Sequence, residues 1–117
     1  MDRNSTAYLV HLCSSEDWAR AQDSGDYRAD TLETAGFIRF SKPGQILKVA
    51  NQYYPAAGNV LLLWIDPTKL VSDLRWEASD GDLFPHLYGP LNLDAVVAES
   101  EFPPDADGVF RTIPNPK

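Results

Sequence analysis

The chain has 117 residues, of which 44% are hydrophobic and 23% charged, the composition of one soluble globular domain that can bury a core without disulfides or metals. Seventeen acidic residues against ten basic ones give a formal net charge of −7, which argues against nucleic-acid partners. A single cysteine rules out an internal disulfide, and the N-terminal residues show neither a secretory signal nor an anchor. We therefore expect a cytoplasmic protein with no membrane partner.

The N-terminal part of the chain predicts a strand followed by a helix. The run 7–12, AYLVHL, is rich in β-forming residues and is expected to be a buried strand. Ser14 is a predicted N-cap for a helix over 14–22, which Gly25 would stop. Two residues three positions apart on this helix are predicted to face the core: Trp18 and Ala21.

A short strand over 37–40 precedes a second predicted helix. Pro43 is tolerated in a first helical turn, and apolar residues then recur at the spacing of one buried helical face: Ile46, Val49, Ala50 and Tyr53. The run 59–65, NVLLLWI, is continuously apolar and of strand length. It predicts a central strand covered on both faces.

The second half of the chain predicts further strands over 74–77 and 95–98. Beyond Pro103 the prolines favour a loop-rich tail over 103–117, with a brief strand at 109–112. Strand, helix, strand, helix and then several strands is the order of an α+β fold. We expect one compact α+β domain over residues 1–117.

The stretch 75–90, RWEASDGDLFPHLYGP, predicts a shaped loop that holds a site. It contains a carboxylate, Glu77, together with His86 and Tyr88, and its prolines and glycines would make it rigid. His86 and Tyr88 point the same way if the residue between them is extended. Imidazole and phenol side by side can bind a ribose hydroxyl, stack on a ring or move a proton. The alternative is a structural corner in which His86 bonds a backbone carbonyl.

Several segments together resemble the family named domain of unknown function 952, over about residues 8–98. They are a first strand ending in a histidine and Cys13, a tryptophan at position 18, GFI-x-x-S at 36–41, LLLxIDPxKL at 61–70, and RWE…DLFPHLYGPLxLDAV at 75–96. The resemblance implies a fold related to the ADP-ribosyltransferase superfamily, with two small, mostly antiparallel sheets and two helices packed on them. Members of that superfamily split NAD at its nicotinamide ribosyl bond or, in one branch, use NAD to remove a phosphate from RNA.

The resemblance also implies NAD as cofactor, bound in a cleft between the two sheets, with no metal. His11 and Arg39 would hold a ribose or the diphosphate, and Ser41 would lie at an anion site beside a helix N-terminus. Tyr88 or Tyr53 would stack on nicotinamide. The predicted catalytic residues, which would assist the departure of nicotinamide, are Glu77 and His86.

Each of these residues also has a structural interpretation. His11 could be a core histidine with both ring nitrogens hydrogen-bonded, and Ser41 could only cap the helix near Pro43. Arg39 could pair with a core carboxylate, and Glu77 with Arg39 or Arg75. The family commonly has a histidine where Arg39 stands, and a guanidinium stays protonated and cannot be a general base at neutral pH.

Two further groupings are less favoured. Three scattered side chains could in principle hold a metal, but no spacing motif supports such a site: His11, Cys13 and His86. Glu99 and Glu101 are interpreted as a solvated strand end.

Two functions stay open. The first is an NAD-using enzyme of the ADP-ribosyltransferase type. The second is a non-catalytic module that binds a small molecule, nucleotide, peptide or protein on the same fold. The acidic charge argues against an RNA substrate. A site would be indicated if four residues converged on one pocket: His11, Arg39, Glu77 and His86.

Overall fold

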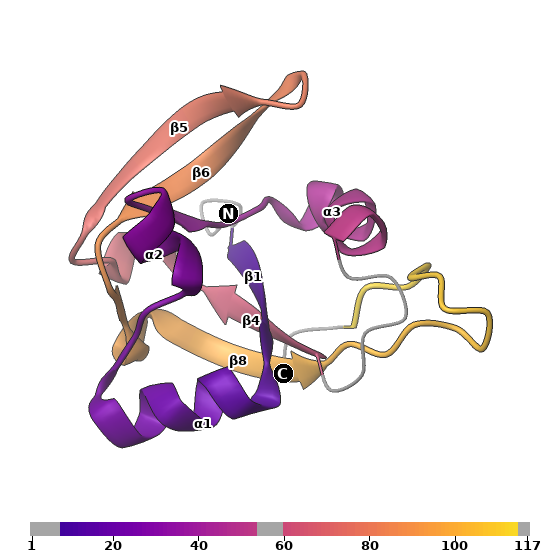
Figure 1. Cartoon of the computed structure of the whole chain (residues 1–117), viewed down its shortest axis with the longest axis horizontal. Coiled ribbons are helices and arrows are strands. Elements are labelled where there is room, and N and C mark those ends of the chain that lie inside the picture. The colour runs from indigo at the N-terminus through magenta and orange to yellow at the C-terminus, as the bar shows by residue number, and fades with distance from the viewer. Residues whose placement is uncertain (1–7, 54–59, 115–117) are drawn as a thin grey trace, which may run out of the picture.

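The computed structural model describes residues 8–53 and 60–114, which form a mixed α+β domain (Figure 1). In these residues all strand pairs are antiparallel and make three sheets. The first sheet has the order β1 (Leu9–Ser14), β4 (Val60–Ile65), β8 (Val96–Glu101). The second has the order β3 (Ile38–Arg39), β6 (Asp82–Tyr88), β5 (Asp73–Ser79). The third pairs β2 (Asp26–Tyr27) with β7 (Leu91–Asn92).

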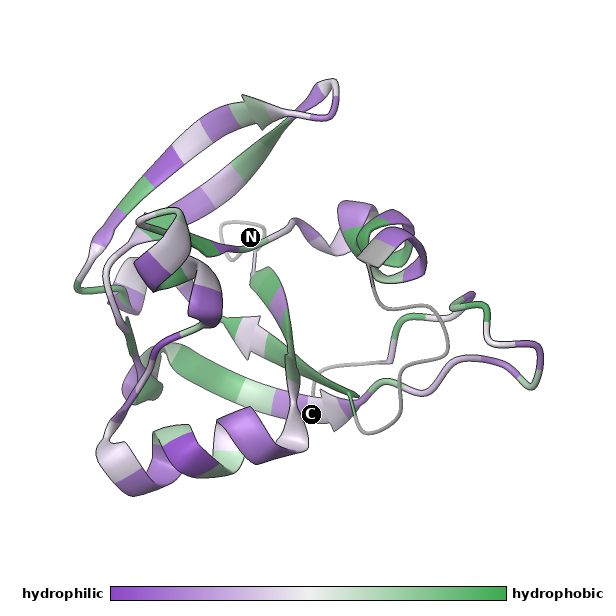
Figure 2. Cartoon of the chain, in the orientation of Figure 1, coloured by the Kyte–Doolittle hydropathy of each residue, from purple (hydrophilic) through white to green (hydrophobic). Residues whose placement is uncertain are grey.

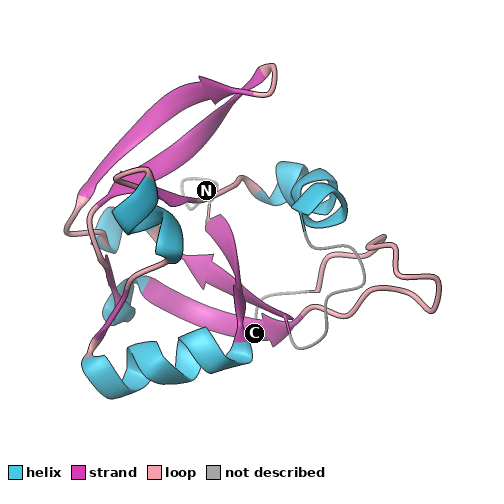
Figure 3. Ribbon diagram, in the orientation of Figure 1, coloured by secondary structure: helices cyan, strands magenta, loops and turns pink. Residues whose placement is uncertain are grey.

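The helices lie around these sheets (Figure 3). They are α1 (Ser15–Ser24), α2 (Asp30–Thr34) and α3 (Ile46–Tyr53), with short 3-10 turns at Pro43–Gln45, Pro67–Lys69 and Leu93–Ala95. The expected α+β class is confirmed, and the β2–β7 pair and α2 are additions to the predicted two sheets and two helices. None of the helices in the described residues is long and apolar enough to cross a membrane.

Local capping chemistry determines where α1 begins and ends. The hydroxyl of Ser14 accepts a hydrogen bond from the backbone N–H of Asp17 at 3.0 Å, as an N-cap does. Gly25 adopts φ 101°, a left-handed conformation that glycine takes without strain, and donates its N–H to the carbonyl of Ala21. Trp18 and Ala21 are buried. The prediction for this helix is confirmed.

The prediction that the run ending at Ile65 is a central, doubly covered strand is also confirmed. β4 lies between β1 and β8, and its green colour in Figure 2 marks it as apolar. Its side chains alternate between two core clusters. One contains Leu63 and Ile65 with Leu9, Trp18 and Leu87; the other contains Leu62 and Trp64 with Val10, Ile46 and Phe102.

The prediction of a loop over 75–90 is wrong, because these residues lie mainly in the β5–β6 hairpin that extends from the body of the molecule (Figure 1). Asp80 and Gly81 form its turn with φ values of 53° and 81°, and two positive φ angles match the twist of paired strands. Pro85 fits because its carbonyl accepts from Phe40, so its missing N–H also faces β3. The ladder with β5 is thereby preserved.

Ser41 does not cap the following helix, contrary to the structural interpretation of that residue. It forms a bridge with Val10, in which each backbone N–H donates to the other residue's carbonyl at 2.9 Å. The turn that leads into α3 begins one residue later, at Lys42, whose N–H donates to the side chain of Gln45 at 2.9 Å. Ser41 is therefore held to β1 by its backbone.

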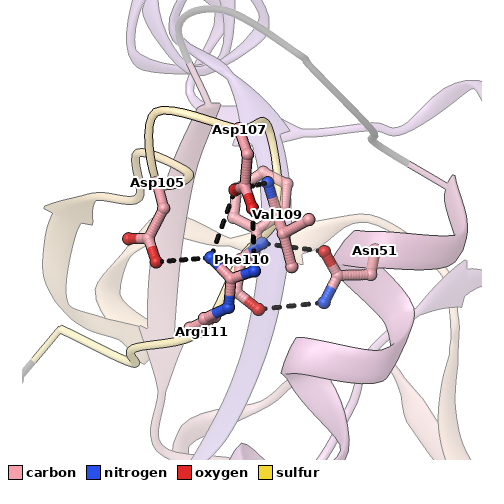
Figure 4. A network of polar contacts seen from close by, with 6 residues as sticks. All are labelled: Asn51, Asp105, Asp107, Val109, Phe110 and Arg111. Atoms are coloured by element: carbon pink, nitrogen blue, oxygen red, sulfur yellow. Dashed lines mark hydrogen bonds and ion pairs between the residues drawn. The ribbon is translucent and has the colours of Figure 1, made fainter.

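The brief strand predicted at 109–112 is not formed. The side-chain amide of Asn51 on α3 bonds both the N–H and the C=O of Phe110, at 2.8 and 2.9 Å (Figure 4). The Phe110 ring is buried beside Phe102, with ring centroids 4.9 Å apart. One side chain thus satisfies the backbone groups that a strand partner would otherwise bond.

Candidate functional site

A cleft of about 410 Å³ lies between the first sheet and the β5–β6 hairpin. Its walls come from β1, from the starts of α1 and α2, from α3, and from the tip and inner face of the hairpin. Four of the predicted site residues line it: His11, Arg39, Ser41 and His86. Glu77 and Tyr88 do not line the cleft but contact His86 or its partner from behind.

Strand register places the predicted residues of the hairpin on one face. Successive side chains of a strand alternate between faces, so Glu77 shares a face with Arg75, and His86 with Tyr88. His86 pairs with Arg75 of β5 on one side and with Arg39 of β3 on the other. Three strands therefore bring these polar side chains together.

Glu77 is bonded by two neighbours through a single oxygen. Its Oε1 accepts from Nδ1 of His86 at 2.7 Å and from the hydroxyl of Tyr88 at 2.7 Å. These bonds, that of Tyr88 first and that of His86 second, hold the pKa of Glu77 below its usual range, and the same carboxylate raises the pKa of Tyr88. Glu77 is thus an ionised acceptor.

The expectation that Glu77 pairs with Arg39 or Arg75 is wrong. Arg75 forms its ion pair with Asp73, at 2.8 Å on the same strand, and its guanidinium lies 4.5 Å from the centre of the Tyr88 ring. Arg39 has no ion-pair partner in the described part of the chain. Its exposed guanidinium lies 5.2 Å from the ring centre of Phe37 and lines the cleft.

His86 is buried, with 4% of its surface exposed, and is fixed from two directions. Its Nδ1 is bonded to Glu77, which corrects the alternative of a bond to a backbone carbonyl. The Phe37 ring stacks on its imidazole, with centroids 4.1 Å apart and planes 14° apart. Its Nε2 is buried and has no hydrogen-bond partner among the described residues. A buried polar atom without a partner is uncommon and indicates a place for a ligand atom.

His11 has both ring nitrogens satisfied. Nδ1 lies 2.8 Å from the carbonyl oxygen of Arg39, which can only accept, so Nδ1 carries the proton. Nε2 then accepts from the hydroxyl of Tyr27 at 2.9 Å. Burial lowers the pKa of His11 to about 4, so the ring is neutral at neutral pH. This is the expected core-histidine geometry, in a side chain that also borders the cleft.

The cleft carries charges of both signs on mainly apolar walls. Arg39 and Lys48 are its cations, and three aspartates line it as well: Asp17, Asp30 and Asp80. Such a lining suits a ligand with an apolar or aromatic body and a few polar groups rather than a bare anion.

The remaining candidates contribute little to the cleft. The side chain of Tyr53 lies outside the described residues. Burial raises the pKa of the Cys13 thiol to about 12, so it is not a thiolate. Within 8–53 and 60–114, no group of three His, Cys, Asp or Glu side chains is placed to hold a metal ion. Glu99 and Glu101 are exposed on β8, and Glu99 accepts from the indole N–H of Trp18 at 2.8 Å.

The sequence reasoning missed three residues of the site. Phe37 is two positions before Arg39, so strand alternation could have placed it on the same face as Arg39. Lys48 is a polar residue between apolar positions of the predicted helix, and periodicity alone does not place it at a cleft. Tyr27 lies on a strand of two residues, which leaves no pattern to detect.

The chain is similar to one family and to one protein of known structure. The model of the family described as protein of unknown function (DUF952) matches residues 12–99. The crystal structure of protein CC0527 from Caulobacter crescentus has a TM-score of 0.82 and 33% identity, covering 89% of this chain and 93% of that chain. The solution NMR structure of CC0527 has a TM-score of 0.78 and 33% identity, covering 90% and 92%. Both are described as structural genomics targets. No curated protein matches.

Proposed function

The chain belongs to the family of proteins of unknown function DUF952, and we propose that its cleft binds a nucleotide, NAD, on a fold of the ADP-ribosyltransferase type. One observation carries this proposal. Residues from β1, β3, the segment after β3, and β6 line a single cleft: His11, Arg39, Ser41 and His86. The cavity volume, about 410 Å³, lies in the range of small-molecule sites.

The charges and walls of the cleft suggest how NAD would lie. Arg39 presents a planar guanidinium without a carboxylate partner in the described residues, and such a group suits a diphosphate. Lys48 adds a second cation. Apolar and aromatic side chains, including Val49 and Phe84, offer a surface for a base or for nicotinamide.

His86 is the residue of the predicted catalytic pair that faces the ligand. Its unpartnered Nε2 would bond a ribose hydroxyl or a water of the bound nucleotide. Glu77 is turned to His86 and Tyr88, so in this arrangement it does not touch the ribose on which positive charge develops when nicotinamide leaves. Any NAD cleavage in this cleft would depend on His86 as the reacting side chain.

The position of Glu77 also favours a second candidate, nucleotide binding without chemistry. ADP-ribosyl transfer is expected to use a carboxylate near the ribosyl cation, and here that carboxylate is bonded elsewhere. A binding module on the same fold would keep the cleft and its cations. The two candidates differ in one observable, the release of nicotinamide.

The test is a titration of ¹⁵N-labelled protein with NAD, combined with chromatography for released nicotinamide. We expect saturable shifts at cleft residues in the wild type and their loss in His86→Ala. Asp73→Asn is the matched control, because Asp73 is on the same hairpin but bonds Arg75 and does not line the cleft. Shifts with nicotinamide release indicate an enzyme, and shifts without release indicate a binding module. Unchanged spectra at millimolar NAD would refute the proposal.

A further inference from the structure

The Glu77–His86 contact has the parts of a proton-transfer pair. We propose that Glu77 and His86 form a carboxylate–imidazole pair in which Nε2 of His86 accepts the proton of a water or hydroxyl bound in the cleft. His86 is the catalytic residue of this pair and Glu77 the positioning residue. The inference deepens the proposed function and rests on it, since the cleft must hold a ligand.

The first requirement of such a pair is a fixed ring, and three contacts fix that of His86. Nδ1 is bonded to Oε1 of Glu77 at 2.7 Å. The Phe37 ring lies parallel to the imidazole at 4.1 Å and limits its rotation. Backbone pairing with both β3 and β5 holds the residue in the middle strand of its sheet. The ring therefore has one orientation.

The second requirement is a defined tautomer. An ionised carboxylate only accepts hydrogen bonds, so Nδ1 of His86 must carry the proton that Glu77 receives. In the neutral ring Nε2 then has a free lone pair. The opposite tautomer would set an Nδ1 lone pair against the carboxylate and leave a buried N–H at Nε2 without an acceptor in the described residues. Only the first tautomer is consistent with the contacts.

The third requirement is stabilisation of the imidazolium that forms. Arg39 and Arg75 are the strand neighbours of His86, and two guanidinium groups near the ring oppose a positive charge on it. Glu77 supplies the compensating negative charge at 2.7 Å. The hydroxyl of Tyr88 donates to the same Oε1 and holds the carboxylate in place. Further charged or titratable groups line the cleft: His11, Asp17, Asp30, Lys48 and Asp80.

With water as the nucleophile and NAD as the ligand, the step balances without another reactant. The O–H bond of water breaks as the Nε2–H bond forms, and the electron pair stays on oxygen. That oxygen bonds C1′ of the ribose while the bond from C1′ to the nicotinamide nitrogen breaks. Nicotinamide leaves neutral with the bonding electron pair, and ADP-ribose is the other product. His86 later releases its proton to solvent.

The test reads the tautomer of His86 directly from the ring ¹⁵N resonances in two-dimensional NMR spectra. In the wild type with a neutral ring we expect a protonated Nδ1 and an unprotonated Nε2. Glu77→Ala should give a mixture of tautomers, whereas Asp73→Asn, a carboxylate of the same strand that bonds Arg75, should leave the tautomer unchanged. Amide spectra of each variant establish that it is folded. A protonated Nε2 or a mixed tautomer in the wild type would overturn the pair.

A kinetic measurement separates positioning from folding. Glu77→Gln keeps an oxygen that can accept from Nδ1 but removes the charge that stabilises the imidazolium. If NAD is cleaved, we expect this variant to lower kcat at least about tenfold with little change in KM. An unchanged kcat would contradict the pair. If the wild type neither binds nor cleaves NAD, the proposed function fails, and the tautomer measurement still decides whether the pair exists.

Discussion

Gln45 donates a hydrogen bond from Nε2 to Oδ2 of Asp82 at 2.8 Å and thereby ties the approach to α3 to the tip of the β5–β6 hairpin. The same nitrogen donates to the carbonyl of Leu83 at 2.9 Å, while Oε1 of Gln45 accepts from Lys42. One buried amide thus joins two walls of the cleft. The bond to Gln45 also holds the pKa of Asp82 below its usual range.

Gln45→Ala should therefore destabilise the protein. The substitution removes three hydrogen bonds, and the expected loss in the free energy of unfolding is about 1–3 kcal/mol. Urea denaturation measures it. Gln22→Ala on the exposed surface of α1 is the control and should change stability little. Equal stability of the two variants would contradict the role given to Gln45.

The stability of the protein should fall as the pH is lowered through the range in which His11 titrates. The pKa of His11 is lowered from 6.5 to about 4 by burial, so the unfolded chain takes up a proton that the folded protein refuses. The contribution is fully present above the unfolded value and is lost as the pH falls toward 4. Between about pH 7.5 and about pH 5 the linkage relation gives a loss of about 2 kcal/mol.

Urea denaturation at both pH values, in the wild type and in His11→Gln, isolates this effect. Other groups titrate equally in the two proteins, so the difference between their pH dependences belongs to His11. We expect a shallower dependence in the variant. The same slope in both proteins would show that His11 is not held neutral.

Gly89 lies too close to Ser72 to carry a side chain. A Cβ at Gly89 would come within 2.8 Å of Cβ of Ser72 and still closer to its hydroxyl. Gly89→Ala should cost about 1–3 kcal/mol, since overpacking forces the neighbour to move. Gly44→Ala is the matched control, because nothing lies within 4 Å of its would-be Cβ. Thermal unfolding should separate the two variants, and the double change Ser72→Gly with Gly89→Ala should recover part of the loss.

Asn51 should control the order of the C-terminal segment. Its amide bonds both backbone groups of Phe110, while Arg111 pairs with Asp105 and Asp107 on the surface (Figure 4). Asn51→Ala should speed amide hydrogen exchange over 105–111, because those backbone bonds are lost. Arg111→Gln should have a smaller effect, since exposed ion pairs contribute little. Comparable protection in wild type and Asn51→Ala would refute this anchor.

The parts of the fold that sequence predicts well are those set by local chemistry. Ser14 and Gly25 define α1 through a cap at each end, and the unbroken apolar run before Asp66 could only be a doubly covered strand. The hairpin was missed although Asp80-Gly81 is a strong turn signal. Pro85 suggested a loop, and only the observed register shows that its missing N–H faces the end of β3.

The site was predictable in its residues but not in its contacts. His86 and Tyr88 were expected on one side because they are two apart in an extended segment. That Glu77 is their partner depends on the register across β5 and β6, which the hairpin turn sets. The contact of His11 with the carbonyl of Arg39 joins segments far apart in sequence, and no local pattern encodes it.

The measurement that tests the account most directly is the Nε2 resonance of His86 in ¹⁵N-labelled protein during addition of NAD. We expect this resonance to move and saturate with the same curve as the backbone amides of Arg39 and Ser41, because all three residues line the cleft. A resonance that stays fixed up to millimolar NAD would contradict the claim that the cleft beside His86 is the NAD site.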